Sequence, residues 1–337
     1  MTSFKQMDID AYTAAHRDEW ERLAQLGKQS SFTGPEADEL IDRYQAGASQ
    51  LSAIRSTAGQ SLQGDRLSLY LSRARLRFTG ASSNVLSRMP AFFLRAIPAA
   101  LYRIRWLSLA VTLASLIVAV LYYFWVSGDA RVLATMGPAS DLEQYAKEDF
   151  VNYYSDHSGG SFTSFVWTNN AWLAAQCVAF GITGVYPLYI LFNTAQSMGQ
   201  IAAVMEHYDR LDVFLLYIAP HGQLELYSIF VAGAAGLAIF WSWIVPGAQT
   251  RSQALAAGGR SLMTVAIGLV LSLFVSGIIE GFVTRQSWPW PIKIGIGTVA
   301  LLAFLSYQWV LGRTAYRLGE TGDLDEFEAG AKQLIAG

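Results

Sequence analysis

Cysteine is almost absent from this sequence of 337 residues, which contains only Cys177. A single cysteine cannot form an internal disulfide, and it excludes a zinc ribbon. Charged side chains make up only 15% of the chain, whereas about 25% is typical of soluble proteins. Residues 1–21 are polar, so we expect no cleavable signal peptide. These shortages exclude a disulfide scaffold and favour a protein with much of its surface in lipid.

Apolar residues are abundant, at 53% of the chain, and the mean hydropathy is +0.29. In residues 1–86 they recur every three or four positions among charged residues, as Trp20, Leu23 and Leu26 do. This spacing is typical of amphipathic helices. We therefore predict a helical domain over residues 1–86, whose apolar stripes form a small bundle core or bind a partner helix.

A basic block precedes the first long apolar segment. Eight arginines and no acidic residue occur here: Arg66, Arg73, Arg75, Arg77, Arg88, Arg95, Arg103 and Arg105. Such a block marks the cytoplasmic side of a membrane, so the domain over residues 1–86 should be cytoplasmic. Residues 87–105 are apolar but interrupted by Pro90 and Pro98, which predicts a basic interfacial helix. Nucleic-acid binding also fits a basic run, but the span that follows at once disfavours it, and we predict no nucleic-acid partner.

Beyond residue 105, six apolar segments approach the length of about 20 residues that a membrane span needs. The predicted spans are about 106–126, 165–180, 186–205, 221–245, 261–282 and 294–311. The predicted fold class is therefore all-α: a polytopic α-helical membrane protein with about six transmembrane helices over residues 106–311. An N-terminal cytoplasmic helical domain precedes them, and a cytoplasmic acidic tail over residues 312–337 follows. The outer segment 127–161 is acidic, and the basic clusters place both termini inside.

A few polar side chains lie at membrane depth in these predicted spans. They are Asn169, Asn170, Asn193, His221, Glu225 and Glu280. Such residues are costly in lipid and are candidates for a functional site. His221 and Glu225 are four residues apart, so they share one helix face. Since the topology brings most of the set to the outer leaflet, we predict an intramembrane polar cluster.

Three interpretations of this cluster stay open. His221, Glu225 and Glu280 can supply three ligands to a metal ion with one open position, although the second histidine of the helix metalloprotease motif is missing. A hydrogen bond from His221 to Glu225 or Glu280 can instead lock two spans together, with asparagines joining further helices. A polar cavity for a ligand or partner peptide is the third. Locking is the favoured interpretation, so we predict no catalytic residue and no cofactor.

Several motifs resemble the stage II sporulation protein M family of bacterial membrane proteins. The matching pieces are Asn169-Asn170, Gly181, Asn193 with Gly199, His221-Gly222-Gln223-Leu224-Glu225-Leu226 and Glu280-Gly281-Phe282-Val283-Thr284. Before the membrane, Trp20-Glu21-Arg22-Leu23, the helix over residues 40–54 and Tyr70-Leu71-Ser72-Arg73-Ala74 are similar to the family's cytoplasmic helices. Tyr227 departs from the pattern, since many members have a proline or small residue there. The departure bears on how the fourth span starts.

The resemblance implies a non-enzymatic scaffold or assembly factor of a cell-envelope complex in the bacterial plasma membrane. In sporulating bacteria the family member works with two cell-wall hydrolases in engulfment, and relatives also occur in bacteria that do not sporulate. Expected partners are membrane lipids and envelope membrane proteins, cell-wall hydrolases among them. Gly233 and Gly236 give the fourth span a small face that suits packing within the chain or a homodimer.

Two other functions remain open from the residues alone. One is a membrane-embedded metal-dependent enzyme that uses His221, Glu225 and Glu280. The other is a transporter or lipid-handling protein with an outward polar cavity formed by Asn169, Asn193 and Glu225. The sequence has no convincing internal repeat, which disfavours a transporter built from inverted repeats.

Overall fold

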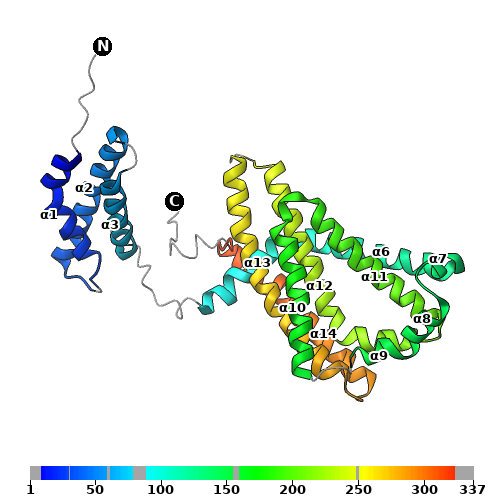
Figure 1. Cartoon of the computed structure of the whole chain (residues 1–337). Helices are drawn as coiled ribbons and strands as arrows, with labels where there is room; N and C mark the ends of the chain where they lie inside the picture. Colours follow the sequence, from blue (N-terminus) through cyan, green and yellow to red (C-terminus); the bar gives the residue numbers. More distant parts are fainter. Residues whose placement is uncertain are drawn as a thin grey trace, which may run out of the picture. The chain divides into compact units, whose positions relative to one another are not determined.

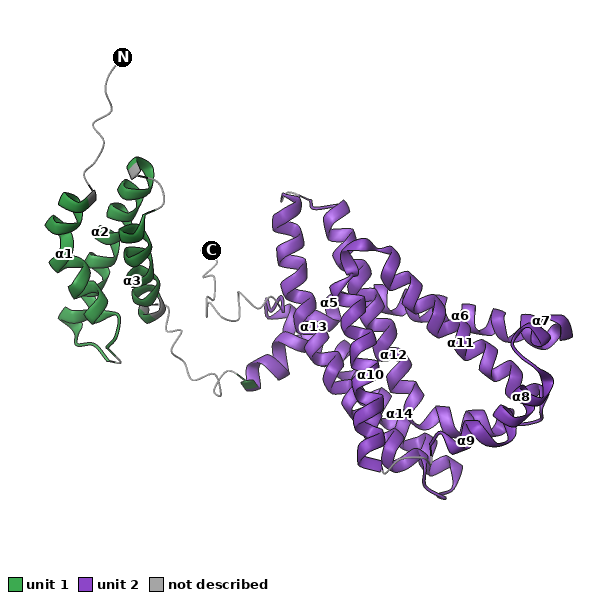
Figure 2. Cartoon of the chain, in the orientation of Figure 1, with its two compact units in different colours: residues 1–89, 328–337 green, residues 90–327 purple. Residues whose placement is uncertain are grey.

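A computed structural model describes residues 9–29, 31–58, 61–78, 89–154, 159–247 and 250–322 of the chain. All regular secondary structure in these ranges is helical (Figure 1). The chain divides into two compact units, which Figure 2 shows in different colours. Unit 1 contains helices α1 to α3, and unit 2 contains the helices that follow residue 89.

Unit 1 is built from α1 (Ile9–Leu26), α2 (Gly34–Ala58) and α3 (Leu62–Phe78). One face of each helix meets in a core formed by Trp20, Leu23, Leu26, Leu40, Ile54, Leu67, Leu71 and Ala74. These positions repeat at three or four residues, so burying them explains why the segments fold as helices. Ile41 of α2 and Leu69 of α3 lie outside this core and are exposed.

A charged network also connects α1 to α2. The Glu39 carboxylate accepts hydrogen bonds from Arg22, at 2.8 Å from Nη2, and from Arg43, at 2.7 Å from Nε. These two guanidinium groups lower the pKa of Glu39 to about 2. The carboxylate therefore stays charged throughout the physiological pH range, which keeps the network intact.

Unit 2 begins with a helix whose apolar side is covered by protein. A π-helical turn, η1 (Phe92–Ala96), leads into α5 (Ile97–Arg103). Residues 97–101 are all buried, and α5 packs on α13 (Arg251–Ile279) and α15 (Gly312–Arg317). The sequence predicts an interfacial helix over residues 87–105. In the described part of this segment, residues 97–101 pack on these two helices, contacts between distant segments that local hydropathy does not reveal.

The remaining elements of unit 2 complete the helical bundle. They are α6 (Arg105–Gly128), α7 (Ala130–Thr135), α8 (Ala139–Gln144), η2 (Tyr145–Asp149), α9 (Phe150–Asn152), α10 (Gly159–Ala179), η3 (Gly181–Thr183), α11 (Val185–His207), α12 (Leu211–Ile244), η4 (Glu280–Thr284), α14 (Trp290–Ser306) and η5 (Tyr307–Leu311). The predicted acidic segment 127–161 thus contains short helices, α7 to α9, in its described part.

Four helical segments among the described residues are long and apolar enough to cross a membrane. They are Arg105–Gly128, Leu211–Ile244, Arg251–Thr284 and Trp290–Arg317, which contain predicted spans one, four, five and six. Helices α10 and α11 contain spans two and three but do not reach the same hydropathy. The apolar side chains of α6 are largely exposed, Leu113, Ile117 and Leu121 among them. Exposed apolar surface of this extent is typical of lipid contact.

Helix α12 is the central helix of unit 2 (Figure 1). It packs on α6, α10, α11, α13 and α14. The sequence predicts that its span starts at His221, but the helix already begins at Leu211 and continues through Pro220. Pro220 is buried where α14 crosses, since a Cβ on Gly297 would lie 1.9 Å from the Pro220 carbonyl oxygen. The missing N–H of proline is tolerated because neighbouring helices support the backbone.

Glycines set the closest approaches between these helices. A Cβ added to Gly236 of α12 would lie 2.3 Å from the carbonyl oxygen of Cys177 in α10. A Cβ on Gly199 of α11 would lie 2.2 Å from the carbonyl oxygen of Ala119 in α6. Helix pairs that meet through small residues gain van der Waals contact that larger side chains prevent.

We expect Gly199→Ala to destabilise the protein by about 1–3 kcal/mol, since the new methyl group forces α6 and α11 apart. Gly295→Ala in α14 is the matched control. A Cβ there meets no atom within 4 Å, and removing a helical glycine should stabilise by about 0.5–1 kcal/mol. Thermal unfolding of both variants in detergent measures the difference, and equal melting temperatures would contradict it.

Candidate functional site

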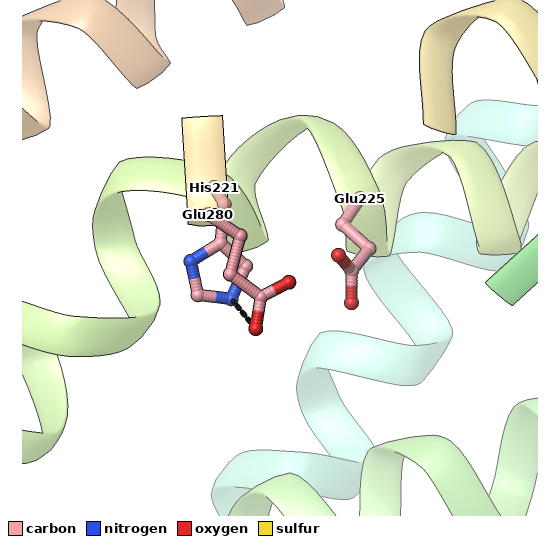
Figure 3. A group of neighbouring side chains, drawn as sticks. All are labelled: His221, Glu225 and Glu280. Atoms are coloured by element: carbon pink, nitrogen blue, oxygen red, sulfur yellow. Dashed lines mark ion pairs between the residues drawn. The ribbon is translucent and has the colours of Figure 1, made fainter. Parts of the chain in front are cut away.

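The predicted His221, Glu225 and Glu280 side chains come together where α12 meets the end of α13. His221 and Glu225 are one helical turn apart on α12, and Glu280 begins the π-helical turn η4. One nitrogen or oxygen from each side chain lies within 4.8 Å of the other two. Figure 3 shows the Glu280 carboxylate against the His221 ring, with the Glu225 carboxylate facing them.

His221 is held by hydrogen bonding on one ring nitrogen. The ring is buried, with 4% of the residue exposed. Its Nδ1 lies 3.1 Å from the hydroxyl of Thr284, which is also buried. Its Nε2 lies 3.7 Å from Oε1 of Glu280, beyond the range of a direct hydrogen bond. The Thr284 contact therefore fixes the ring so that Nε2 faces the two carboxylates.

Glu225 is supported from two other helices. The Ser276 hydroxyl of α13 lies 3.3 Å from Oε2 of Glu225 and 3.1 Å from the His221 carbonyl oxygen. The side chain of Asn170, from α10, also hydrogen-bonds the Glu225 carboxylate. Three helices thus contribute polar groups around Glu225, which is itself partly buried.

Glu280 differs from its neighbours because part of its carboxylate is unsatisfied. The residue is 4% exposed, and its buried Oε2 has no hydrogen-bond partner. In the described part of the chain, neither Glu280 nor Glu225 forms an ion pair with a lysine or arginine. The nearby Lys293 instead donates to the carbonyl oxygens of Thr284, at 2.8 Å, and Gln286, at 3.3 Å. Two carboxylates therefore face each other without a lysine or arginine to balance their charge.

Aromatic side chains cover one side of the cluster. The Tyr154 ring lies 6.2 Å from the His221 ring and 5.0 Å from that of Tyr217. Phe162 packs against Tyr154 as well. These rings belong to a core that joins η2, α9 and α10 to the first half of α12. They replace water beside His221 with apolar surface, which strengthens electrostatic interactions within the cluster.

Comparison with protein families identifies unit 2. Residues 108–285 match the family model described as stage II sporulation protein M. The chain belongs to the stage II sporulation protein M family. This confirms the resemblance for the motifs between residues 169 and 284, whereas the similar pieces before residue 108 lie outside the matched range. Residues 10–80 separately match a domain of unknown function. No curated protein and no solved structure matches the chain significantly.

The part of the chain that matches the stage II sporulation protein M family contains every predicted polar-cluster residue. Asn170 is buried beside Glu225, whereas Asn169 is exposed and donates to the Asn170 side chain at 3.3 Å. Asn193 has no described hydrogen bond to the three titratable residues. Its amide donates to the Tyr189 carbonyl oxygen of its own helix, at 2.7 Å. Family membership and the apolar helices make this a membrane protein.

Two residues of the polar cluster, Ser276 and Thr284, were not predicted as site residues from the sequence. A signal was available, because Ser272, Ser276, Glu280 and Thr284 follow one another at intervals of four residues. That spacing brings small hydroxyl side chains to the same side of the helix as Glu280. The Ser272 hydroxyl lies 2.8 Å from that of Ser228 in α12, which extends the polar contact along the two helices.

We expect Ser276→Ala to lower the free energy of unfolding by about 1–3 kcal/mol, since it leaves Glu225 and a buried carbonyl without their shared donor. Ser164→Ala is the matched control, because Ser164 is exposed and bonds only a carbonyl oxygen of its own helix. Thermal unfolding of the two variants in detergent tests the contact. Equal stability of both variants would show that Ser276 does not support the cluster.

Proposed function

We propose that this protein is an integral membrane scaffold or assembly factor of a bacterial cell-envelope complex. The observation that carries the proposal is the joining of two parts: a membrane bundle of the stage II sporulation protein M family and a three-helix unit with its own core. Because unit 1 has a core of its own, its exposed residues are not needed for its folding and can bind another protein. Candidate partners are envelope membrane proteins, including cell-wall hydrolases.

One face of α3 supports partner binding. Leu62 and Leu69 are seven residues apart on this helix, and they are 67% and 49% exposed. Arg66 and Arg73 are also exposed, and each lies four residues after one of these leucines. The four residues therefore form one apolar and basic stripe along the helix. Exposed leucines flanked by arginines suit an acidic amphipathic helix of a partner protein.

Photocrosslinking in native membranes tests the scaffold. A photoreactive amino acid at position 69 should form an adduct with the same envelope protein in repeated experiments, because it replaces an exposed leucine of the stripe. The matched control carries the same group at Asp18, an exposed polar position on α1. A Leu62→Asp change should reduce the adduct from position 69 at least fivefold. Adducts with lipid alone, or equal adducts from both positions, would refute the scaffold role.

We further propose that the chain crosses the bacterial plasma membrane six times, with both termini in the cytoplasm. The arginine distribution supports this orientation. Helices α10 and α11, of 21 and 23 residues, are long enough to span. They are joined through η3 and Gly184, whose φ of 65° allows the tight turn.

Thiol labelling distinguishes six spans from four. In a Cys177→Ser background, a cysteine at Ile182, an exposed residue in the η3 turn, should react with an impermeant reagent only after the membrane is opened. If α10 and α11 stay outside, the same cysteine reacts in intact cells. Ser140→Cys and Ser252→Cys, both at exposed positions, are the outside and inside controls.

A further inference from the structure

The spacing between His221 and Glu280 is unusual for a buried pair. Their closest atoms, Nε2 and Oε1, lie 3.7 Å apart, which is too far for a good hydrogen bond. Two ligands bound to one tetrahedral metal ion at about 2.1 Å are separated by about 3.4 Å. The observed distance is thus closer to that of two metal ligands than to that of hydrogen-bonded partners.

The third residue completes a compact set of donors. With the three ligand atoms within 4.8 Å of one another, a point between them lies no more than about 2.8 Å from each. Side-chain adjustments of under about 1 Å then bring all three to the bond lengths of zinc, about 2.0–2.2 Å. The unpartnered Oε2 of the buried Glu280 is an independent sign that the cluster lacks a positively charged partner.

We propose that His221, Glu225 and Glu280 bind one divalent transition-metal ion of the zinc class. Two carboxylates balance the charge of a divalent cation, and an imidazole nitrogen favours zinc, iron or a related metal over magnesium or calcium. Three protein ligands leave a fourth position for water or for a group from a partner. The ion joins α12 to η4 at the point where the carboxylates face each other.

The surrounding hydrogen bonds fit this role. For Nε2 to bind the ion, Nδ1 must carry the proton and donate it to Thr284, 3.1 Å away. The Thr284 hydroxyl can then donate to the Ile279 carbonyl oxygen, at 3.4 Å. Ser276 and Asn170 hold the Glu225 carboxylate in the same way. Ordered hydrogen bonds of the kind that hold His221 and Glu225 are a regular feature of metal sites.

A purely hydrogen-bonded lock explains less of the geometry. It leaves Oε2 of Glu280 unsatisfied and provides no good bond between His221 and Glu280. A bound ion accounts for both, since it supplies the missing positive charge and sets the spacing. The metal site is independent of the scaffold role, because it requires no partner protein.

Elemental analysis of the full chain, purified in detergent without a metal-affinity tag, tests the site. The wild type should contain about one transition-metal ion per chain, and His221→Ala and Glu280→Gln at least tenfold less. Glu206→Gln is the matched control. Glu206 is an exposed carboxylate at the end of α11, and it should leave the metal content unchanged.

Metal uptake by the stripped wild type gives a readout that does not depend on the variants folding. After chelation, Zn²⁺ should raise the melting temperature of the wild type, and Thr284→Val should weaken Zn²⁺ affinity by about 10–100-fold. The proposal is overturned if the wild type contains no metal and the stripped protein gains no stability from Zn²⁺, Fe²⁺ or Mn²⁺. It is equally overturned if Glu280→Gln retains the wild-type metal content.

Discussion

The close packing of α12 against its neighbours is the constraint on which the rest of unit 2 depends. Residues 228–236 of α12 are all buried, and glycine or alanine occupies five of these positions. Without larger side chains, the backbones of α10 and α12 approach within contact distance at Gly236. Because the hydrophobic effect gives little drive for helix association inside lipid, such contacts carry much of the packing energy. The same helix then brings His221 and Glu225 against α13 and η4.

Because the two helices pack closely, water cannot replace a missing hydrogen-bond partner in the polar contacts between α12 and α13. Ser228 bonds Ser272, Ser276 bonds Glu225, and Thr284 bonds His221. In a low-dielectric interior each such group costs about 1–3 kcal/mol when it is left unsatisfied, and a charged group costs more. The one unsatisfied carboxylate oxygen in this row belongs to Glu280. An exception among otherwise paired groups suggests that this position holds something other than a second side chain.

The positions of the helices can be predicted from the sequence more fully than the contacts between them. Helical periodicity locates α1 to α3, and apolar runs locate the helices that contain all six predicted spans. The i to i+4 spacing of His221 and Glu225, combined with topology, brings Glu280 to the same site. Membrane depth does not specify which way a helix faces, so the contacts of Asn193 do not follow from the sequence. On α11 its amide bonds the helix's own backbone at Tyr189.

Other contacts depend on partners that are distant in the sequence. Ser276 and Thr284 look like ordinary hydroxyl residues of a membrane helix, which commonly bond their own backbone. Packing against α12 gives Ser276 an acceptor in the His221 carbonyl oxygen and gives Thr284 a partner in the His221 ring. Helix α12 begins at Leu211, before the span predicted from residue 221, and continues through Pro220, although a proline inside a helix normally costs stability. Inside a bundle, neighbouring helices remove much of that penalty.

The low hydropathy of α10 is also linked to the polar cluster. This helix falls below the level of a strong membrane span, and Asn169, Asn170 and Gln176 are among the reasons. Asn170 and Gln176 have partners within unit 2: the Glu225 carboxylate for one and the Tyr186 hydroxyl for the other. In the proposed topology, α10 therefore depends on the bundle to offset the cost of burying these amides in lipid. The side chains that weaken α10 as an isolated span are the ones that attach it to its neighbours, so insertion of α10 and assembly of the cluster should be coupled.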